Sequence, residues 1–232
     1  MQQKIKFKIK TLSNLMIGGA PAPFEIGGVD QYTATTYEGL PYIPASSFKG
    51  ALREIVHEDH GLGAKVIAGL YEAYLKNEKD KHWDEIQKNY DEKAQKRIKE
   101  RYDQPAEPEF LFGIKGLNNS PKLMINDLYL SEDFSDPSKC FSIDAKTSIE
   151  NKNGEVVSNP RTYKAARNGL VFEGEILFYK IELLGGDALM LCRDYIIEKL
   201  EQFNEGIYRL GNSKSRGYGR IEVTVEKDCE VS

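Results

Sequence analysis

The sequence has few cysteines and no long hydrophobic run, and both shortages exclude classes of protein. Its 232 residues include three cysteines, Cys140, Cys192 and Cys229, which form no C-x-x-C pair. Neither a disulfide framework nor a zinc site is therefore expected. No apolar run approaches the roughly 20 residues that span a bilayer, and no apolar segment follows the lysine-rich start to make a signal peptide. We expect a cytoplasmic protein that makes no membrane contact.

Net positive charge is also missing. The chain has 32 Lys and Arg against 36 Asp and Glu, a formal net charge of -4, whereas nucleic-acid affinity usually rests on many cations that neutralise phosphates. Residues 209 to 220 nevertheless carry four cations and no carboxylate. Neither a Walker loop nor G-x-G-x-x-G after a strand is present, so the common nucleotide-binding loops are excluded. The sequence predicts a local basic loop in an acidic protein.

Hydrophobic periodicity predicts an α+β fold. Residues 4 to 10 and 219 to 227 alternate between apolar and polar side chains, which is typical of half-buried strands. A helix is predicted after Pro44, with Ser46 or Ser47 as N-cap and an apolar face that begins at Phe48. Further signals predict strands at 122 to 130 and 169 to 183 and a helix at 188 to 203. This order suits a ferredoxin-like sheet with helices on one face, which RNA-recognition (RRM-like) domains also use.

Two insertions are expected within this single domain of residues 1 to 232. Helical patterns at 64 to 76 and about 80 to 102 predict a helical insertion over about 60 to 105, whose charge run indicates a solvated face. A polar stretch with Asn153-Gly154 near its centre predicts a protruding hairpin over about 146 to 168. Its basic flanks include Lys146 and Arg161.

Two other segments have the composition of phosphate sites. A helix start near Ser46, Ser47 and Lys49 offers free amides and a favourable dipole to an anion, although an ordinary capped helix has the same sequence. In the loop at 211 to 220, glycines allow close backbone approach and can form an anion-binding nest. Its candidate residues are Gly211, Lys214, Arg216, Gly217 and Tyr218, the last as a ring on which a base could stack. A flexible connection is the alternative for this loop.

The candidates for catalysis are a loop carboxylate and two histidines. Asp30 lies in the long polar loop at 17 to 39, where it could hold a hydrated Mg²⁺ or accept a proton from a ribose 2′-hydroxyl. A turn residue is the alternative. His57 and His60 suit metal-free acid and base catalysis, or simply the solvated C-terminal end of a helix.

Taken in order, these segments resemble the repeat-associated mysterious protein (RAMP) superfamily of CRISPR systems. The resemblance runs nearly end to end and rests on LPYIPASSFKGALRE at 40 to 54, LFG at 111 to 113 and GNSKSRGYGRI at 211 to 221. IGGVDQYTATTYEGLPYIPASSFKG at 26 to 50 and the segment at 146 to 175 are similar to the backbone subunit of type III (Csm/Cmr-type) effector complexes. In that subunit the second segment forms a thumb hairpin across the guide-target duplex.

The resemblance implies a guide-RNA-binding subunit that cleaves complementary single-stranded target RNA as a metal-dependent endoribonuclease of the assembled complex. Asp30 falls on the aspartate required for cleavage, with Mg²⁺ held mostly by RNA phosphates and water. Expected partners are guide (CRISPR) RNA, target RNA, further copies of the chain and other effector subunits. The RNA contacts implied are Ser46, Ser47, Lys49, Arg53, Lys146, Arg161, Gly211, Lys214, Arg216, Gly217 and Tyr218.

Three alternatives stay open at this point. One is a non-catalytic RNA-binding or capping subunit of the same complex. Another is a guide-processing endoribonuclease that uses His57 or His60. The third is a domain that binds a phosphorylated metabolite through the glycine-rich loop.

Overall fold

The structure, a computed structural model, describes residues 4 to 18, 31 to 152 and 155 to 226, with only the backbone described at 146, at 148 to 152 and at 155 to 160. The helices are α1 (Ala45–Glu58), α2 (Leu62–Asn89), α3 (Glu92–Tyr102) and α4 (Ala188–Glu201). Short 3-10 helices are η1 (Pro108–Phe112), η2 (Pro137–Lys139), η3 (Ile181–Leu184), η4 (Gln202–Glu205) and η5 (Lys214–Arg216). The strands are β1 (Lys4–Thr11), β2 (Gln31–Tyr32), β3 (Lys122–Ile125), β4 (Tyr129–Leu130), β5 (Phe141–Lys152), β6 (Glu155–Ala166), β7 (Val171–Tyr179) and β8 (Ile221–Val225).

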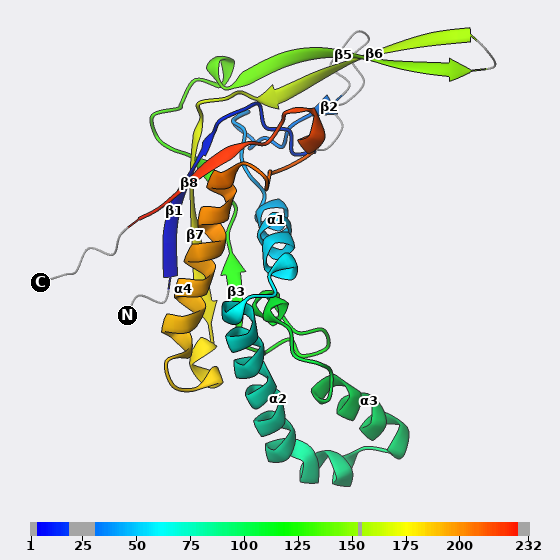
Figure 1. The fold of residues 1–232 in the computed structure, drawn as a ribbon, viewed down its shortest axis with the longest axis vertical. Coiled ribbons are helices and arrows are strands. Elements are labelled where there is room, and N and C mark those ends of the chain that lie inside the picture. The colour runs from blue at the N-terminus through cyan, green and yellow to red at the C-terminus, as the bar shows by residue number, and fades with distance from the viewer. Residues whose placement is uncertain (1–3, 19–30, 153–154, 227–232) are drawn as a thin grey trace, which may run out of the picture. The chain divides into compact units, whose positions relative to one another are not determined.

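The main sheet has the strand order β3-β7-β1-β8, with β4 paired to β7 (Figure 1). Helix α1 lies between β1 and β3 in the chain, and α4 lies between β7 and β8. This is the strand order of a ferredoxin-like sheet, so the α+β fold expected from the sequence is confirmed. The alternation in β1 is confirmed too, because Ile5, Phe7 and Ile9 are buried and the lysines between them are exposed.

The chain divides into two compact units. The first, here the helical unit, comprises Met1–Ile5, Leu52–Met124 and Ile176–Lys199. The second, here the hairpin unit, comprises Lys6–Ala51, Ile125–Glu175 and Leu200–Ser232.

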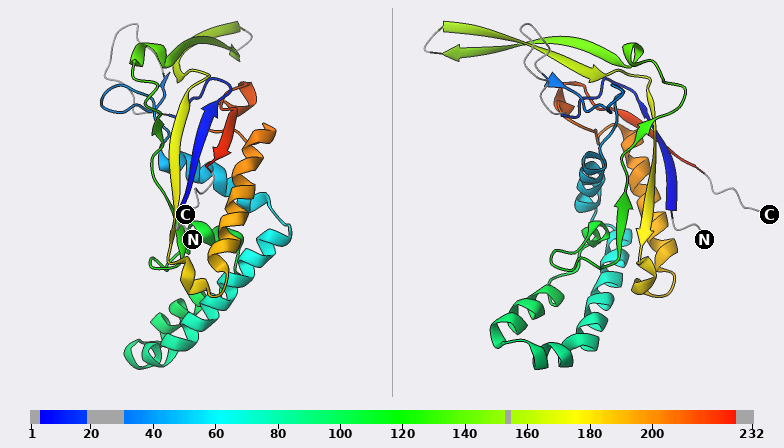
Figure 2. Two further views of the ribbon diagram at one scale, coloured as in Figure 1. Left: turned by 90° about the vertical axis from the view of Figure 1, so that its left-hand side faces the viewer. Right: turned by 180° about the vertical axis from the view of Figure 1, so that it is seen from behind.

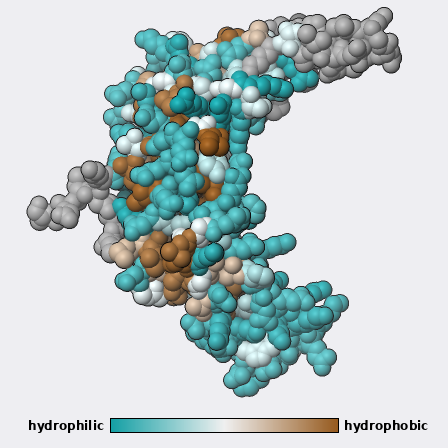
Figure 3. All heavy atoms as spheres, viewed as in Figure 1, coloured by the Kyte–Doolittle hydropathy of each residue, from teal (hydrophilic) through white to brown (hydrophobic). Residues whose placement is uncertain are grey.

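In the helical unit, the boundary between α2 and α3 differs from the prediction. The sequence predicts two helices that meet near residues 77 to 79, but α2 continues to Asn89 and α3 begins after Asp91. Residues 76 to 81 contain no helix breaker, whereas the Asp91 side chain accepts a hydrogen bond from the Ala94 amide at 2.7 Å and caps the second helix. The surface of the α2 and α3 end is largely hydrophilic (Figure 3).

Helix α2 is held at its N-terminal half by buried aromatic packing. Tyr71 is fully buried, donates a hydrogen bond to the Pro121 carbonyl at 3.0 Å and meets the Phe110 ring edge-on at 5.8 Å. Buried hydroxyls of this kind need a partner.

No helix in the part of the chain that the structure describes is long and apolar enough to cross a membrane.

In the hairpin unit, β5 and β6 form a long antiparallel hairpin. Their pairing runs from Phe141 opposite Ala166 to Lys152 opposite Glu155, so Asn153 and Gly154 connect the strands and lie outside the described residues. Strand β2 adds to β6 in parallel, with Gln31 opposite Tyr163. The two strands of the hairpin extend well beyond the rest of this unit (Figure 1, Figure 2). The hairpin begins five residues earlier than the sequence predicts.

Candidate nucleic-acid interface

The glycine-rich loop at 211 to 220 is a tightly hydrogen-bonded turn. Gly211 has a φ of +78°, and a Cβ atom there would lie 2.3 Å from the Met16 carbonyl oxygen. The Asn212 amide donates to that same oxygen at 2.6 Å. The Arg209 guanidinium donates to the Lys214 carbonyl at 3.0 Å and closes the loop over η5. Gly211 is thus required by the close approach of two protein segments.

Tyr218 is buried, an arrangement that does not favour the predicted stacking of its ring on a nucleobase. Its side chain is buried against Met16 and Ala165, with Tyr163 packed beside them. Its hydroxyl donates a hydrogen bond to the Asp144 carboxylate. Burial, followed by the hydrogen bond to Asp144, raises the pKa of Tyr218 well above its usual range.

Asp144 is the hub of a cluster that sequence reasoning missed. Its carboxylate also accepts hydrogen bonds from Asn14 Nδ2 at 3.0 Å and Ser142 Oγ at 2.8 Å. Together with Tyr218 these residues make up the Asp144 cluster. The cluster joins the segment after β1, the first residues of the hairpin and the glycine-rich loop. In sequence, Asp144 is one polar residue in a polar strand, so no signal singled it out.

The loop and the hairpin carry exposed cations around this cluster. Arg216 and Arg161 are exposed, Lys214 is half-buried, and Gly217 leaves open space where a Cβ atom would stand. The hairpin register places Lys146 directly opposite Arg161.

The start of α1 differs from the predicted phosphate site. The helix begins at Ala45, whose amide donates to Asp127 Oδ1 at 2.7 Å, so a carboxylate from a distant segment caps the helix and neither serine is the N-cap. Ser46 is exposed in the first turn, and Ser47 and Lys49 are half-buried. This terminus already has a bound carboxylate, which a phosphate would have to displace. Arg53 is exposed on the same helix but belongs to the helical unit.

Among the candidates for catalysis, Asp30 lies outside the described residues. The residue after it in sequence, Gln31, begins β2 and pairs with Tyr163 of the hairpin. Among residues 4 to 18, 31 to 152 and 155 to 226, no group of three His, Cys, Asp or Glu side chains could hold a metal ion.

His57 has a structural partner. Its Nδ1 lies 2.5 Å from Oε1 of the buried Glu109, and this hydrogen bond together with the carboxylate charge raises the pKa of His57 above its usual value. An imidazole with a raised pKa is protonated more of the time near neutral pH, which leaves less of the neutral form that a general base requires. His60 is exposed. This arrangement does not favour a histidine-based ribonuclease.

Comparison with known proteins now places the chain in a family. The family model of the RAMP superfamily matches residues 8 to 222. The chain belongs to the RAMP superfamily. This RAMP protein is 26% identical, over 242 aligned residues, to the CRISPR system Cms endoribonuclease Csm3 of Enterococcus italicus, a match that covers 97% of this chain and 92% of the relative. The family predicted from the sequence is confirmed.

A solved structure shares the fold. It is the cryo-EM structure of the Type III-B Cmr-beta bound to cognate target RNA, one chain of which matches with a TM-score of 0.50 at 20% identity. The match covers 97% of this RAMP protein, which spans 60% of the length of that chain. At this identity the likeness shows the fold alone.

Proposed function

We propose that this RAMP protein is a guide-RNA-binding backbone subunit of a type III CRISPR effector complex and cleaves target RNA complementary to the guide. The observation that carries the proposal is the nearly full-length similarity to Csm3, a protein named as an endoribonuclease, over 97% of this chain. The fold shared with a chain of Cmr-beta, a type III assembly bound to target RNA, supports it.

In this role the protein holds RNA by its backbone, and base pairing supplies the sequence specificity. The exposed Arg216 and Arg161 and the open backbone at Gly217 suit contacts with phosphates. The Asp144 cluster fixes the loop relative to the first residues of the hairpin. The remaining predicted contacts, including Ser46, Lys49 and Arg53, stay predictions.

The proposed chemistry places Asp30 as a general base. Its carboxylate accepts the proton of a target ribose 2′-hydroxyl, whose oxygen forms a bond to the adjacent phosphorus while the bond from phosphorus to the 5′-oxygen breaks. The products are a 2′,3′-cyclic phosphate and a departing 5′-oxygen, which takes up a proton to become a hydroxyl end. Bound Mg²⁺, held mostly by phosphates and water, would neutralise charge there.

Salt-dependent RNA binding tests the first half of the proposal. We expect the chain to bind a labelled guide RNA with an affinity that falls steeply as salt rises, because counterions are released at each neutralised phosphate. Arg216→Ala should reduce the slope of log affinity against log salt by about 1. Lys99→Ala, on exposed helix α3, is the matched control and should leave the slope unchanged. A wild-type chain with no salt-dependent RNA affinity would contradict the proposal.

A further inference from the structure

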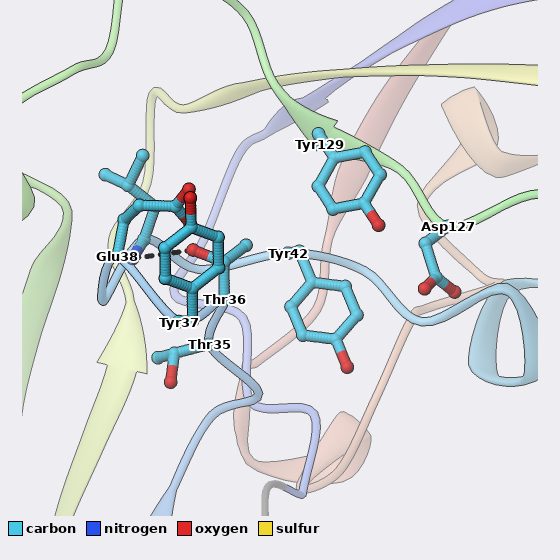
Figure 4. A pocket seen from close by; sticks show the side chains of 8 residues that line it. Thr35, Thr36, Tyr37, Glu38, Tyr42, Asp127 and Tyr129 are labelled. Carbon is cyan, nitrogen blue, oxygen red and sulfur yellow. Dashed lines mark hydrogen bonds between the residues drawn. The ribbon is translucent and has the colours of Figure 1, made fainter.

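The hairpin unit has a pocket of about 580 Å³, and its lining, among the described residues, includes none from the basic loop or from β5 and β6. Three tyrosines and two carboxylates dominate its lining: Tyr37, Tyr42, Tyr129, Glu38 and Asp127. We call it the tyrosine pocket. In Figure 4, Tyr42 and Tyr129 lie side by side between Asp127 and the Tyr37 and Glu38 pair.

The tyrosine rings form a platform that water reaches. Tyr42 and Tyr129 stack with their ring centroids 6.0 Å apart and their planes at 21°. Tyr129 is 53% exposed and Tyr37 is 97% exposed. Exposed aromatic rings gathered around a hollow are typical of a site that another molecule covers.

The charge of the pocket is negative. Glu38 and Asp127 both line it, and no Lys or Arg does so among the described residues. The hydrogen bond from the Tyr37 hydroxyl lowers the pKa of Glu38, so this carboxylate is ionised at neutral pH. A second pocket shares Asp127 and Tyr129 with the first. Its lining also contains one lysine, Lys6, and three further carboxylates, Glu173, Glu175 and Glu226.

This chemistry selects a cation. RNA phosphates are repelled by a surface of ionised carboxylates, whereas a guanidinium is attracted to tyrosine faces and to carboxylates alike. Arginine suits both features at once, because its plane can stack on a ring while its N–H groups bind a carboxylate in pairs.

We propose that the tyrosine pocket receives an arginine side chain from a second copy of this chain. Four exposed arginines of the hairpin unit, Arg161, Arg167, Arg216 and Arg220, do not line the pocket. The acidic hollow and these basic side chains therefore occupy different places on one molecule. A contact between two such unlike surfaces of identical subunits is heterologous and repeats along a filament. The inference rests on the proposed function, in which copies assemble on one RNA. It also accounts for an RNA-binding subunit with net negative charge.

Site-directed cross-linking tests the contact. The photoreactive residue p-benzoylphenylalanine would replace the exposed Tyr37, with replacement of Tyr90, 53% exposed after α2, as the control. We expect irradiation of the RNA-assembled protein to give a covalent dimer only from position 37, with the cross-linked peptide of the second copy containing arginine. Cross-links from position 37 to RNA, or no dimer, would overturn the proposal.

Assembly measured with a double variant gives a second test. Tyr37→Ala combined with Glu38→Gln changes two exposed side chains, so the fold should be kept. We expect the concentration needed to add further copies to an RNA-bound first copy to rise at least tenfold, while affinity of the first copy for RNA stays unchanged. Unchanged addition of copies would overturn the inference. Loss of RNA binding by the wild type would instead count against the proposed function.

Discussion

The hydroxyl of Tyr218 donates a hydrogen bond to the carboxylate of Asp144, and so links the glycine-rich loop to the first residues of the β5 and β6 hairpin. The two residues are 74 positions apart in sequence. Asn14 and Ser142 donate hydrogen bonds to the same carboxylate. These bonds compensate the part-buried Asp144 carboxylate for the water that it has lost. The relationship makes Tyr218 a positioning residue for two proposed RNA-binding segments.

Tyr218→Phe removes this hydroxyl and leaves the ring in place. We expect the free energy of unfolding to fall by about 1.5 to 3 kcal/mol, the usual effect of losing a hydrogen bond to a charged group. Urea denaturation measures it. Tyr129→Phe, at a ring 53% exposed in the same unit, should change stability by no more than about 0.5 kcal/mol. Equal effects of the two substitutions would show that the Tyr218 hydroxyl contributes nothing.

Alanine substitutions at two glycines of the loop distinguish the cost of backbone strain from the cost of a steric clash. Both Gly211 and Gly217 have positive φ, but a Cβ atom would meet the Met16 carbonyl at 2.3 Å at Gly211 and nothing within 4 Å at Gly217. Gly217→Ala should cost about 1 to 2 kcal/mol from the left-handed conformation alone. Gly211→Ala adds a clash and should cost about 2 to 5 kcal/mol. Denaturation curves that rank the two variants the other way would contradict the observed approach of Gly211 to Met16.

The His57 and Glu109 pair predicts a pH-dependent contribution to stability. The pKa of folded His57 is raised by Glu109, so the stabilisation is fully present below the unfolded value of about 6.5 and is lost as pH rises through the raised pKa. The stability difference between wild type and His57→Gln should therefore be largest in mildly acidic solution and shrink above neutral pH.

Nuclear magnetic resonance titration of the His57 ring checks the cause. In Glu109→Gln the pKa of His57 should fall back toward about 6.5, because the substitution removes the carboxylate charge. A pKa that is the same in both proteins would contradict the assigned ion pair. RNA cleavage should survive His57→Gln, since the proposed reaction does not use this histidine.

Local patterns were enough to predict the main elements of the fold. The alternation of Ile5, Phe7 and Ile9 with lysines predicts β1, and the structure buries all three. Such patterns report only on neighbours along the chain. The continuation of α2 to Asn89 was missed. Without a helix breaker, the sequence pattern of one long helix is the same as that of two adjacent helices.

The site depended on contacts between distant segments, which one sequence does not reveal. Asp127 caps a helix that begins 82 residues earlier. The sequence instead predicts a serine cap, because Ser46 and Ser47 lie beside the helix start. Tyr218 was expected to face RNA because its neighbours are glycines and cations, yet Met16 and Ala165 bury it. The family resemblance, in contrast, was readable because it depends on the order of short motifs.

Cleavage of a labelled RNA complementary to the guide tests the central claim most directly. Complexes reconstituted with wild-type protein, with Asp30→Ala and with Asp133→Ala, a change at an exposed loop aspartate, would be compared with and without Mg²⁺. The account predicts regularly spaced, Mg²⁺-dependent products from the wild type and Asp133→Ala, and an intact but equally well-bound target with Asp30→Ala. Undiminished cleavage by Asp30→Ala, or an uncut target with all three proteins, would contradict it.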